Sequence, residues 1–159
     1  MLAGVQAWQT RHLPERLPAD TALQLLHPDG RREATTLAAW QTSHAGPVVL
    51  HVWAEWCPIC RAEESSVTRL ARDAPVLTIA MQSGPADAVT RVLRQRELPW
   101  TTAVDPRGEL ARALGVRAVP AFVVMDADGR LRAASVGYTS EIGMRLRLGW
   151  VRLWSTRLN

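Results

Sequence analysis

Both cysteines of the chain lie in one short motif, C-P-I-C at residues 57–60, directly after an apolar run. Residues 48–53 of that run are mostly apolar and β-branched, which predicts a buried strand. The residues after Pro58 suit the first turns of a helix. We therefore expect Cys57 at a helix N-terminus, where free N–H groups and the helix dipole stabilise a thiolate. Cys60 is expected one turn further along the same face, close enough to form a short, reversible disulfide.

Other uses of a cysteine pair fit this motif less well. A structural disulfide stabilises more when it closes a long loop, and two intervening residues close a very short one. A zinc site needs two further ligands, but there is no second cysteine pair, and the histidines lack a ligand spacing. The histidines are His12, His27, His44 and His51. Two inert core cysteines would not call for a tryptophan and a proline around them at a strand-to-helix junction. The pattern therefore favours redox chemistry.

Length and composition indicate one globular domain. With 159 residues and 47% hydrophobic content, the chain can bury one sizeable core. Its formal charge of +4 comes from 19 arginines and no lysine, spread along the chain, which indicates a solvated basic surface and no nucleic-acid partner. No stretch reaches the ~18 apolar residues of a membrane helix, and residues 1–8 are too short for a secretion signal. We expect a soluble monomer.

Strand and helix patterns alternate along the chain. The expected elements are a β-hairpin at 21–26 and 31–35, a short helix at 37–42, a strand at 48–53, a helix to about Arg72, a strand at 76–81, a helix containing Val89 and Leu93, a strand at 100–104, a helix around Leu110 and Leu114, a hairpin at 122–125 and 131–136, and a helix at 141–154. Strands that alternate with helices predict parallel pairing, whereas hairpins are antiparallel, so we expect a mixed sheet.

The final helix carries apolar residues and arginines in alternation. We expect Ile142, Leu146, Gly149 and Leu153 to pack against the sheet and the arginine-bearing side to be solvated. The alternative is contact of this helix with a membrane surface or a partner, through Met144, Leu148, Trp150, Val151 and Trp154 between Arg145, Arg147 and Arg152.

The motif W-A-E-W-C-P-I-C at residues 53–60 resembles the active-site motif of the thioredoxin superfamily. A second match, at residues 115–120, places Pro120 just before the strand at Phe122. The hairpin before the cysteines and the helix and strand between Met81 and Val104 resemble the TlpA/ResA/CcmG-like branch. Further positions match that branch, namely Asp105, Gly108, Leu110, Ala111, Leu114, Gly115, Val116, Pro120, Phe122, Asp126 and Gly129.

The resemblance covers residues 21–154 and implies a fold of the α/β class. The fold would be thioredoxin-like, a mixed central sheet flanked by helices, with an N-terminal β-hairpin and a helix-strand insert.

The resemblance also implies thiol-disulfide exchange. Cys57, exposed at the helix start, would attack a partner disulfide as the thiolate, and the more buried Cys60 would then release the reduced partner. The direction of electron flow is open. The residues expected to support the cysteines are Trp56, Pro58 and Ile59 at the rim, Val119 and Pro120 in the facing loop, and His51 in the strand. Pro120 would be cis, and Val119 would touch both the cysteines and an incoming chain.

Two residues depart from the family pattern. His51 occupies a buried strand position where relatives place Asp or Asn, and Ala121 follows the proline where the family often has Thr. His51 would be either a proton acceptor for Cys60 or a hydrogen-bonded core residue, and the sequence leaves both open. No metal and no cofactor is expected. The expected partners are protein thiol or disulfide substrates and a redox partner protein.

Members of this branch are usually bacterial, face the periplasm or cell exterior and hang from an N-terminal membrane helix. We therefore expect residues 1–20 to be an arm or juxtamembrane linker, residues 21–159 to be the domain, and the anchor to be absent from this chain.

Two other activities fit the sequence less well. A thiol peroxidase would need a peroxidatic cysteine pattern that is not present. A copper-binding metallochaperone module would use Cys57, Cys60 and a histidine. Copper carriers on this fold, however, tend to have a wider cysteine spacing and a downstream histidine, and no histidine follows His51.

Overall fold

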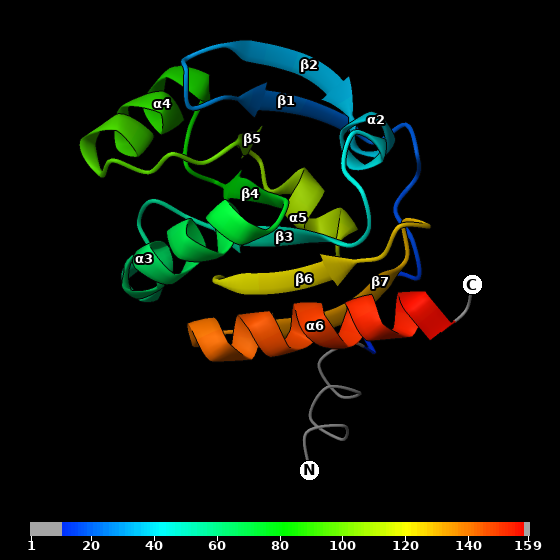
Figure 1. Cartoon of the computed structure of the whole chain (residues 1–159). Coiled ribbons are helices and arrows are strands. Elements are labelled where there is room, and N and C mark those ends of the chain that lie inside the picture. The colour runs from blue at the N-terminus through cyan, green and yellow to red at the C-terminus, as the bar shows by residue number, and fades with distance from the viewer. Residues whose placement is uncertain (1–10, 158–159) are drawn as a thin grey trace.

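The computed structural model describes residues 11–157, in which seven strands form one mixed sheet flanked by helices (Figure 1). The strands are β1 (Ala22–Leu26), β2 (Arg32–Thr36), β3 (Val48–Trp53), β4 (Val76–Met81), β5 (Thr102–Asp105), β6 (Ala121–Met125) and β7 (Leu131–Val136). The helices are α2 (Leu37–Thr42), α3 (Pro58–Asp73), α4 (Ala86–Gln95), α5 (Glu109–Ala113) and α6 (Glu141–Arg157). The expected α/β, thioredoxin-like architecture is confirmed.

The strands run in the order β2-β1-β5-β4-β3-β6-β7. β3, β4 and β5 are parallel to one another, whereas β6 is antiparallel to β3 and β7 to β6. The hairpin of β1 and β2 joins the sheet through β1, which pairs antiparallel with β5. Strand β5 of the insert therefore lies between the hairpin and the central strands.

Helices cover both faces of the sheet, so every residue of β3 is buried. Val49 and Trp53 point to the face on which α3, α4 and α6 pack, and Val48, Leu50 and Val52 point to the face on which α2 and α5 pack. The continuous apolar run in the sequence thus reflects a central strand. It ends at the edge of the sheet where the cysteine motif begins.

Helix α6 packs through a different side from the one expected. Met144, Leu148 and Val151 are buried against the sheet, whereas Ile142, Leu146 and Leu153 are 72%, 63% and 65% exposed. Both sets of residues have a spacing of three or four, so helical periodicity alone could not choose between them. The prediction that Ile142, Leu146, Gly149 and Leu153 face the sheet is wrong.

The described part of the expected arm, residues 11–20, lies against the domain. Arg16 forms an isolated bridge with Arg130, and the backbone N–H of Leu131 donates to the carbonyl of Glu15 at 3.0 Å. A Cβ atom on Gly115 would clash with the carbonyl oxygen of His12, so the arm leaves no room there for a side chain. The boundary at residue 20 stays a prediction, and the rest of the arm lies outside the described residues.

Among residues 11–157, every helix is too short or too polar to cross a membrane.

Candidate active site

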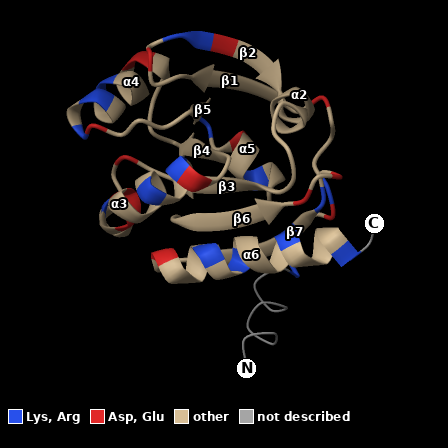
Figure 2. Ribbon diagram, in the orientation of Figure 1, with Lys and Arg blue, Asp and Glu red and all other residues tan. Residues whose placement is uncertain are grey.

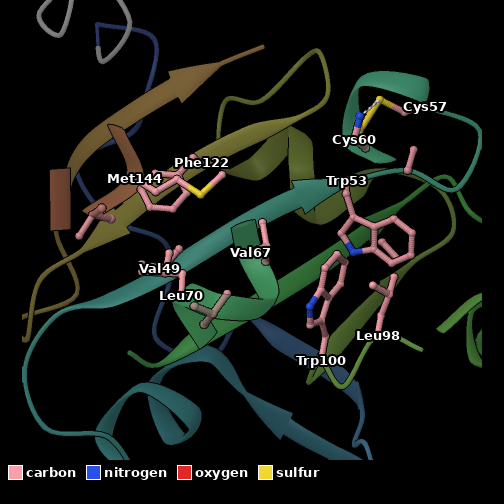
Figure 3. Packing of buried hydrophobic residues seen from close by; sticks show 14 of the residues in the cluster. Val49, Trp53, Cys57, Cys60, Val67, Leu70, Leu98, Trp100, Phe122 and Met144 are labelled. Atoms are coloured by element: carbon pink, nitrogen blue, oxygen red, sulfur yellow. Dashed lines mark hydrogen bonds between the residues drawn. A yellow bond between two sulfur atoms is a disulfide. The ribbon is translucent and has the colours of Figure 1, made fainter. Parts of the chain in front are cut away.

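Cys57 and Cys60 form a disulfide at the start of α3 (Figure 3). Cys57 is the N-cap residue of the helix, and Pro58 occupies its first turn. The backbone N–H of Cys60 donates to the Cys57 Sγ at 3.1 Å. Because this donor and the helix dipole both favour negative charge, the same arrangement stabilises a Cys57 thiolate once the disulfide is reduced.

Both sulfur atoms are covered in the disulfide form. Cys57 is 5% exposed and Cys60 is 2% exposed, so the expectation that Cys57 is exposed is wrong for this state. Exposure lies instead in the residues beside it. Trp56 is 55% exposed and Ile59 is 51% exposed, and Pro58 is also exposed. An incoming chain therefore meets an apolar rim before it reaches sulfur.

The loop carrying Pro120 faces the disulfide. The Val119–Pro120 peptide bond is cis, as the resemblance implies, and the Val119 carbonyl oxygen lies 3.9 Å from the Cys57 Sγ. Val119 is half-buried and packs against the hydrophobic clusters on both faces of the sheet. Sequence positions 62 residues apart are thus in contact at the sulfur atom.

The end of β7 extends the apolar rim. Val136 pairs with Ala121 directly after the proline, and the backbone N–H of Gly137 donates to the Pro120 carbonyl at 2.8 Å. Val136 and Tyr138 are 47% and 61% exposed. No local pattern in the sequence assigns these two residues to the site, because their place beside Pro120 depends on the pairing of β7 with β6.

The loop after β4 supports the other side of the motif. The Trp56 Nε1–H donates to the Gln82 carbonyl at 3.1 Å, and the Glu55 backbone N–H donates to the Ser83 Oγ at 2.9 Å. Arg96 donates to the Glu55 carbonyl at 2.9 Å and to the Glu64 carboxylate at 3.0 Å, so it joins the motif to α3. No local pattern in the sequence points to this role for Arg96.

His51 lies on the side of β3 that faces α3, between Val49 and Trp53. It is 1% exposed, its ring meets Trp100 edge-on at 6.1 Å between centroids, and neither ring nitrogen has a hydrogen-bond partner among the described residues. Burial lowers the pKa of the His51 imidazole to about 4, so the ring is neutral at neutral pH. Among the described residues, His51 is therefore buried without the hydrogen bond that a core role was expected to give it. The role of His51 as a proton acceptor stays a prediction.

Glu63 is a site neighbour that the sequence analysis missed. It follows Cys60 by three residues on α3, is 1% exposed, and accepts a hydrogen bond from the Thr139 backbone N–H. Burial raises the pKa of the Glu63 carboxyl to about 7. Its spacing from Cys60 already placed it on the buried side of the helix, and that signal was available in the sequence.

Within residues 11–157, no group of three or more His, Cys, Asp or Glu side chains is placed to hold a metal ion.

Residues 15–145 match the family model described as Redoxin. The thioredoxin-like protein of Haemophilus influenzae is 30% identical over 103 residues, which are 64% of this chain and 61% of that protein. The thiol:disulfide interchange protein DsbE homolog of Paracoccus denitrificans is 36% identical over 87 residues, which are 54% of this chain and 48% of that protein. The chain therefore spans about half to three-fifths of the length of these curated relatives.

The solved structure of the exposed lipoprotein thioredoxin Etrx1 from Streptococcus pneumoniae has the same fold. It superposes with a TM-score of 0.68 at 22% identity and covers 82% of this chain and 99% of that one. Three observations agree on the family of this chain. The family model matches most of the described residues, a cysteine pair lies at the start of α3, and a loop with a cis-proline faces it. This chain belongs to the Redoxin family and, within the thioredoxin superfamily, to the TlpA/ResA/CcmG-like branch.

Proposed function

We propose that this protein is a thiol-disulfide oxidoreductase that exchanges disulfides with protein thiols through Cys57 and Cys60. The observation that carries the proposal is the disulfide at the start of α3, with the Val119 carbonyl oxygen 3.9 Å from the Cys57 Sγ. An extended substrate chain lying along the loop before Pro120 would bring its own sulfur to Cys57. The exposed rim of Trp56, Ile59 and Tyr138 offers apolar contact on either side of that path.

In the reducing direction, the Cys57 thiolate attacks one sulfur of the partner disulfide, and the other partner sulfur leaves as a thiolate. Cys60 then loses its proton and attacks the Cys57 Sγ in the mixed disulfide. The second partner sulfur leaves, and the enzyme regains the disulfide described above. Two electrons pass from the two enzyme thiols to the partner. The same steps in reverse oxidise a partner dithiol.

The proton of Cys60 needs an acceptor on the buried side of α3. His51 is proposed for this role because it is buried on the same side of the sheet as α3 and neither ring nitrogen has a hydrogen-bond partner among the described residues. Its pKa of about 4 makes the protonated ring unfavourable, so the proton would stay on His51 only briefly. Replacement of His51 by Leu is therefore expected to slow release of the partner from the mixed disulfide and to leave the first attack by Cys57 unchanged. Rapid acid quenching and separation of the mixed disulfide would measure the two steps. Equal slowing of both steps would contradict the role.

The activity is tested by insulin reduction together with a trapping experiment. We expect Cys57→Ser to abolish activity, and Cys60→Ser to accumulate a mixed disulfide because the second step is lost. Ser65→Ala, an exposed change on the same helix, serves as the control. Metal analysis of the reduced protein accompanies the assay. Stoichiometric copper with no insulin reduction would overturn the proposal in favour of a metal-binding module.

The direction of electron flow is read from the reduction potential of the cysteine pair. Trp53 lies in the same buried cluster as both cysteines, so its fluorescence is a suitable reporter during equilibration in glutathione buffers (Figure 3). A value near roughly −270 mV would indicate a reductase that draws electrons from a partner protein, and one near roughly −120 mV a disulfide donor. A protein without any redox-dependent transition would contradict thiol-disulfide exchange.

The proposed location is the bacterial periplasm or cell envelope, with residues 1–20 as the linker to a membrane helix. The soluble secreted antigen MPT53 of Mycobacterium tuberculosis is 31% identical over 134 residues, and its description as secreted supports a location outside the cytoplasm. The proposed oligomeric state is a monomer, which light scattering on the purified protein would test. A genomic reading frame that starts at the present Met1, with no apolar segment before it, would contradict the anchor.

A further inference from the structure

Helix α6 has a second apolar side, which faces away from the sheet. Residues spaced by three or four positions lie on one side of a helix, and five large apolar residues of α6 do so while remaining exposed. They are Ile142 (72% exposed), Leu146 (63%), Trp150 (47%), Leu153 (65%) and Trp154 (55%). We call this set the α6 ridge. In Figure 1 the helix runs along the outside of the molecule beside β6 and β7.

The α6 ridge is not needed to hold the helix in place. Met144, Leu148 and Val151 already anchor α6 to the sheet from the opposite side. The outer side of a helix on a soluble domain is normally polar, and a continuous row of large apolar side chains is typical of a surface that binds something. Packing of α6 on the sheet therefore does not account for the apolar residues of the ridge.

The charge of α6 points to an anionic partner. Residues 142–157 contain four arginines and no acidic residue. Glu141, the one acidic residue of the helix, pairs with Arg69 and Arg145. Figure 2 shows red only at the start of α6 and blue along its length. Arg152 and Arg157 are exposed and form no ion pair with the residues that the structure describes.

A second copy of the chain is a poor occupant of this surface. From residue 142 to residue 154 the ridge is about 18 Å long, and a helix face is roughly 10 Å wide. The accessible surface of one such helix side falls short of the ~800 Å² that each partner buries in an interface of standard size. Self-association would also bring arginine-bearing flanks together without acidic residues to neutralise them.

We propose that the α6 ridge docks on the surface of an anionic lipid bilayer. Tryptophan and leucine side chains on one side of a helix with arginines beside them are the pattern of helices that lie in the membrane interface. Trp150 and Trp154 would lie at the level of the headgroups, and Arg152 and Arg157 would contact lipid phosphates with their long side chains. This surface is distinct from the cysteine site, and the proposal does not depend on its activity.

Docking would also orient the cysteine site. Tyr138 at the site rim precedes Glu141 at the start of α6, and Gly137 is hydrogen-bonded to Pro120. With α6 lying on the lipid, the rim would therefore sit beside the plane of the headgroups. A partner protein in the same membrane would meet Cys57 from the side.

The test is co-sedimentation of the disulfide-bonded protein with vesicles. Vesicles of phosphatidylglycerol mixed with phosphatidylcholine are compared with vesicles of phosphatidylcholine alone. We expect binding to the first that weakens as salt is added, little binding to the second, and quenching of tryptophan fluorescence by brominated lipid. Leu146→Gln with Leu153→Gln should lower the partition at least tenfold, because two large apolar contacts with the lipid are lost. Separately, Arg152→Gln with Arg157→Gln should lower the partition at least tenfold, since each basic residue is worth about 1 kcal/mol at such a surface.

The matched control is Arg91→Gln with Arg94→Gln, which removes the same charge from exposed positions on α4. We expect it to change the partition less than twofold. Absence of binding to both kinds of vesicle would overturn the proposal, as would equal loss in the control and in the α6 arginine variant. A dimer in solution that the leucine variant dissociates would assign the ridge to a second copy instead. Insulin reduction by the leucine and arginine variants should match the parent protein, which separates this surface from the cysteine site.

Discussion

At the scale of single residues, two buried titratable groups near the cysteines respond to pH in opposite directions. His51 has its pKa lowered from 6.5 to about 4, and Glu63 has its pKa raised from 4.5 to about 7. Between pH 6.5 and about 4 the unfolded chain binds more protons at His51 than the folded chain does, so folding stability falls as the pH falls through this range. Between pH 4.5 and about 7 the folded chain binds more protons at Glu63 than the unfolded chain does, so folding stability falls as the pH rises through this range. Since the two windows overlap between pH 4.5 and 6.5, the two contributions largely offset each other there, and variants of each residue are needed to separate them.

The first residue-scale prediction concerns His51→Leu. The parent protein should lose roughly 3 kcal/mol of unfolding free energy through His51 as the pH falls from 6.5 to about 4, at about 1.4 kcal/mol per pKa unit. The variant should lack this loss, because Leu fills the site without a group to protonate. Urea unfolding at several pH values measures the difference. His12→Leu, at an exposed position, is the control, and an equal change there would contradict the assignment.

The second residue-scale prediction concerns Glu63→Gln. The amide oxygen can still accept from the Thr139 backbone N–H, but it cannot ionise. The stability cost that appears in the parent between pH 4.5 and about 7 should therefore be reduced, by up to roughly 3 kcal/mol at higher pH. Urea midpoints at pH 5 and pH 8 measure this. A variant that is less stable than the parent at both pH values would contradict the raised pKa.

At the scale of elements, α6 offers a matched pair of substitutions. Met144→Ala removes a fully buried side chain and should lower the unfolding free energy by about 2–5 kcal/mol. Leu146→Ala lies on the exposed α6 ridge and should change it by less than about 0.5 kcal/mol. Equilibrium urea unfolding of both variants in the disulfide form decides which side packs. A larger loss for Leu146→Ala would restore the interpretation made from the sequence.

The elements also show where prediction from sequence succeeds and where it stops. The buried strand, the cysteine turn and α3 follow one another along the chain, so local patterns identify them. The choice between the two apolar sides of α6 depends on how β6 and β7 pair, which helical spacing does not encode. The same holds for Arg96, whose partners Glu55 and Glu64 are brought to it only by the packing of α3 beside the C-terminal end of α4.

At the scale of the whole molecule, the site forms where two distant parts of the chain meet. The pair of cysteines and the loop at Pro120 were both predicted, because each is a local motif and the resemblance places them together. The contributions of Val136 and Tyr138 were not predicted, since they arise from the β7 edge of the folded sheet. Burial of Glu63 was available from its spacing, whereas its contact with Thr139 required the start of α6 to be placed.

The contact between the arm and Gly115 has a mechanical consequence. If the chain is held by its N-terminus, any pull travels along the arm and reaches the domain first at Leu131, which is bonded to Glu15, and at Gly115, which touches His12. Gly115 begins the loop that leads to Val119 and Pro120. A force on the arm would therefore act on the loop that faces the sulfur atoms before it acts on β1. The β1–β2 hairpin, at the opposite edge of the sheet, would be the last part of the sheet to be strained.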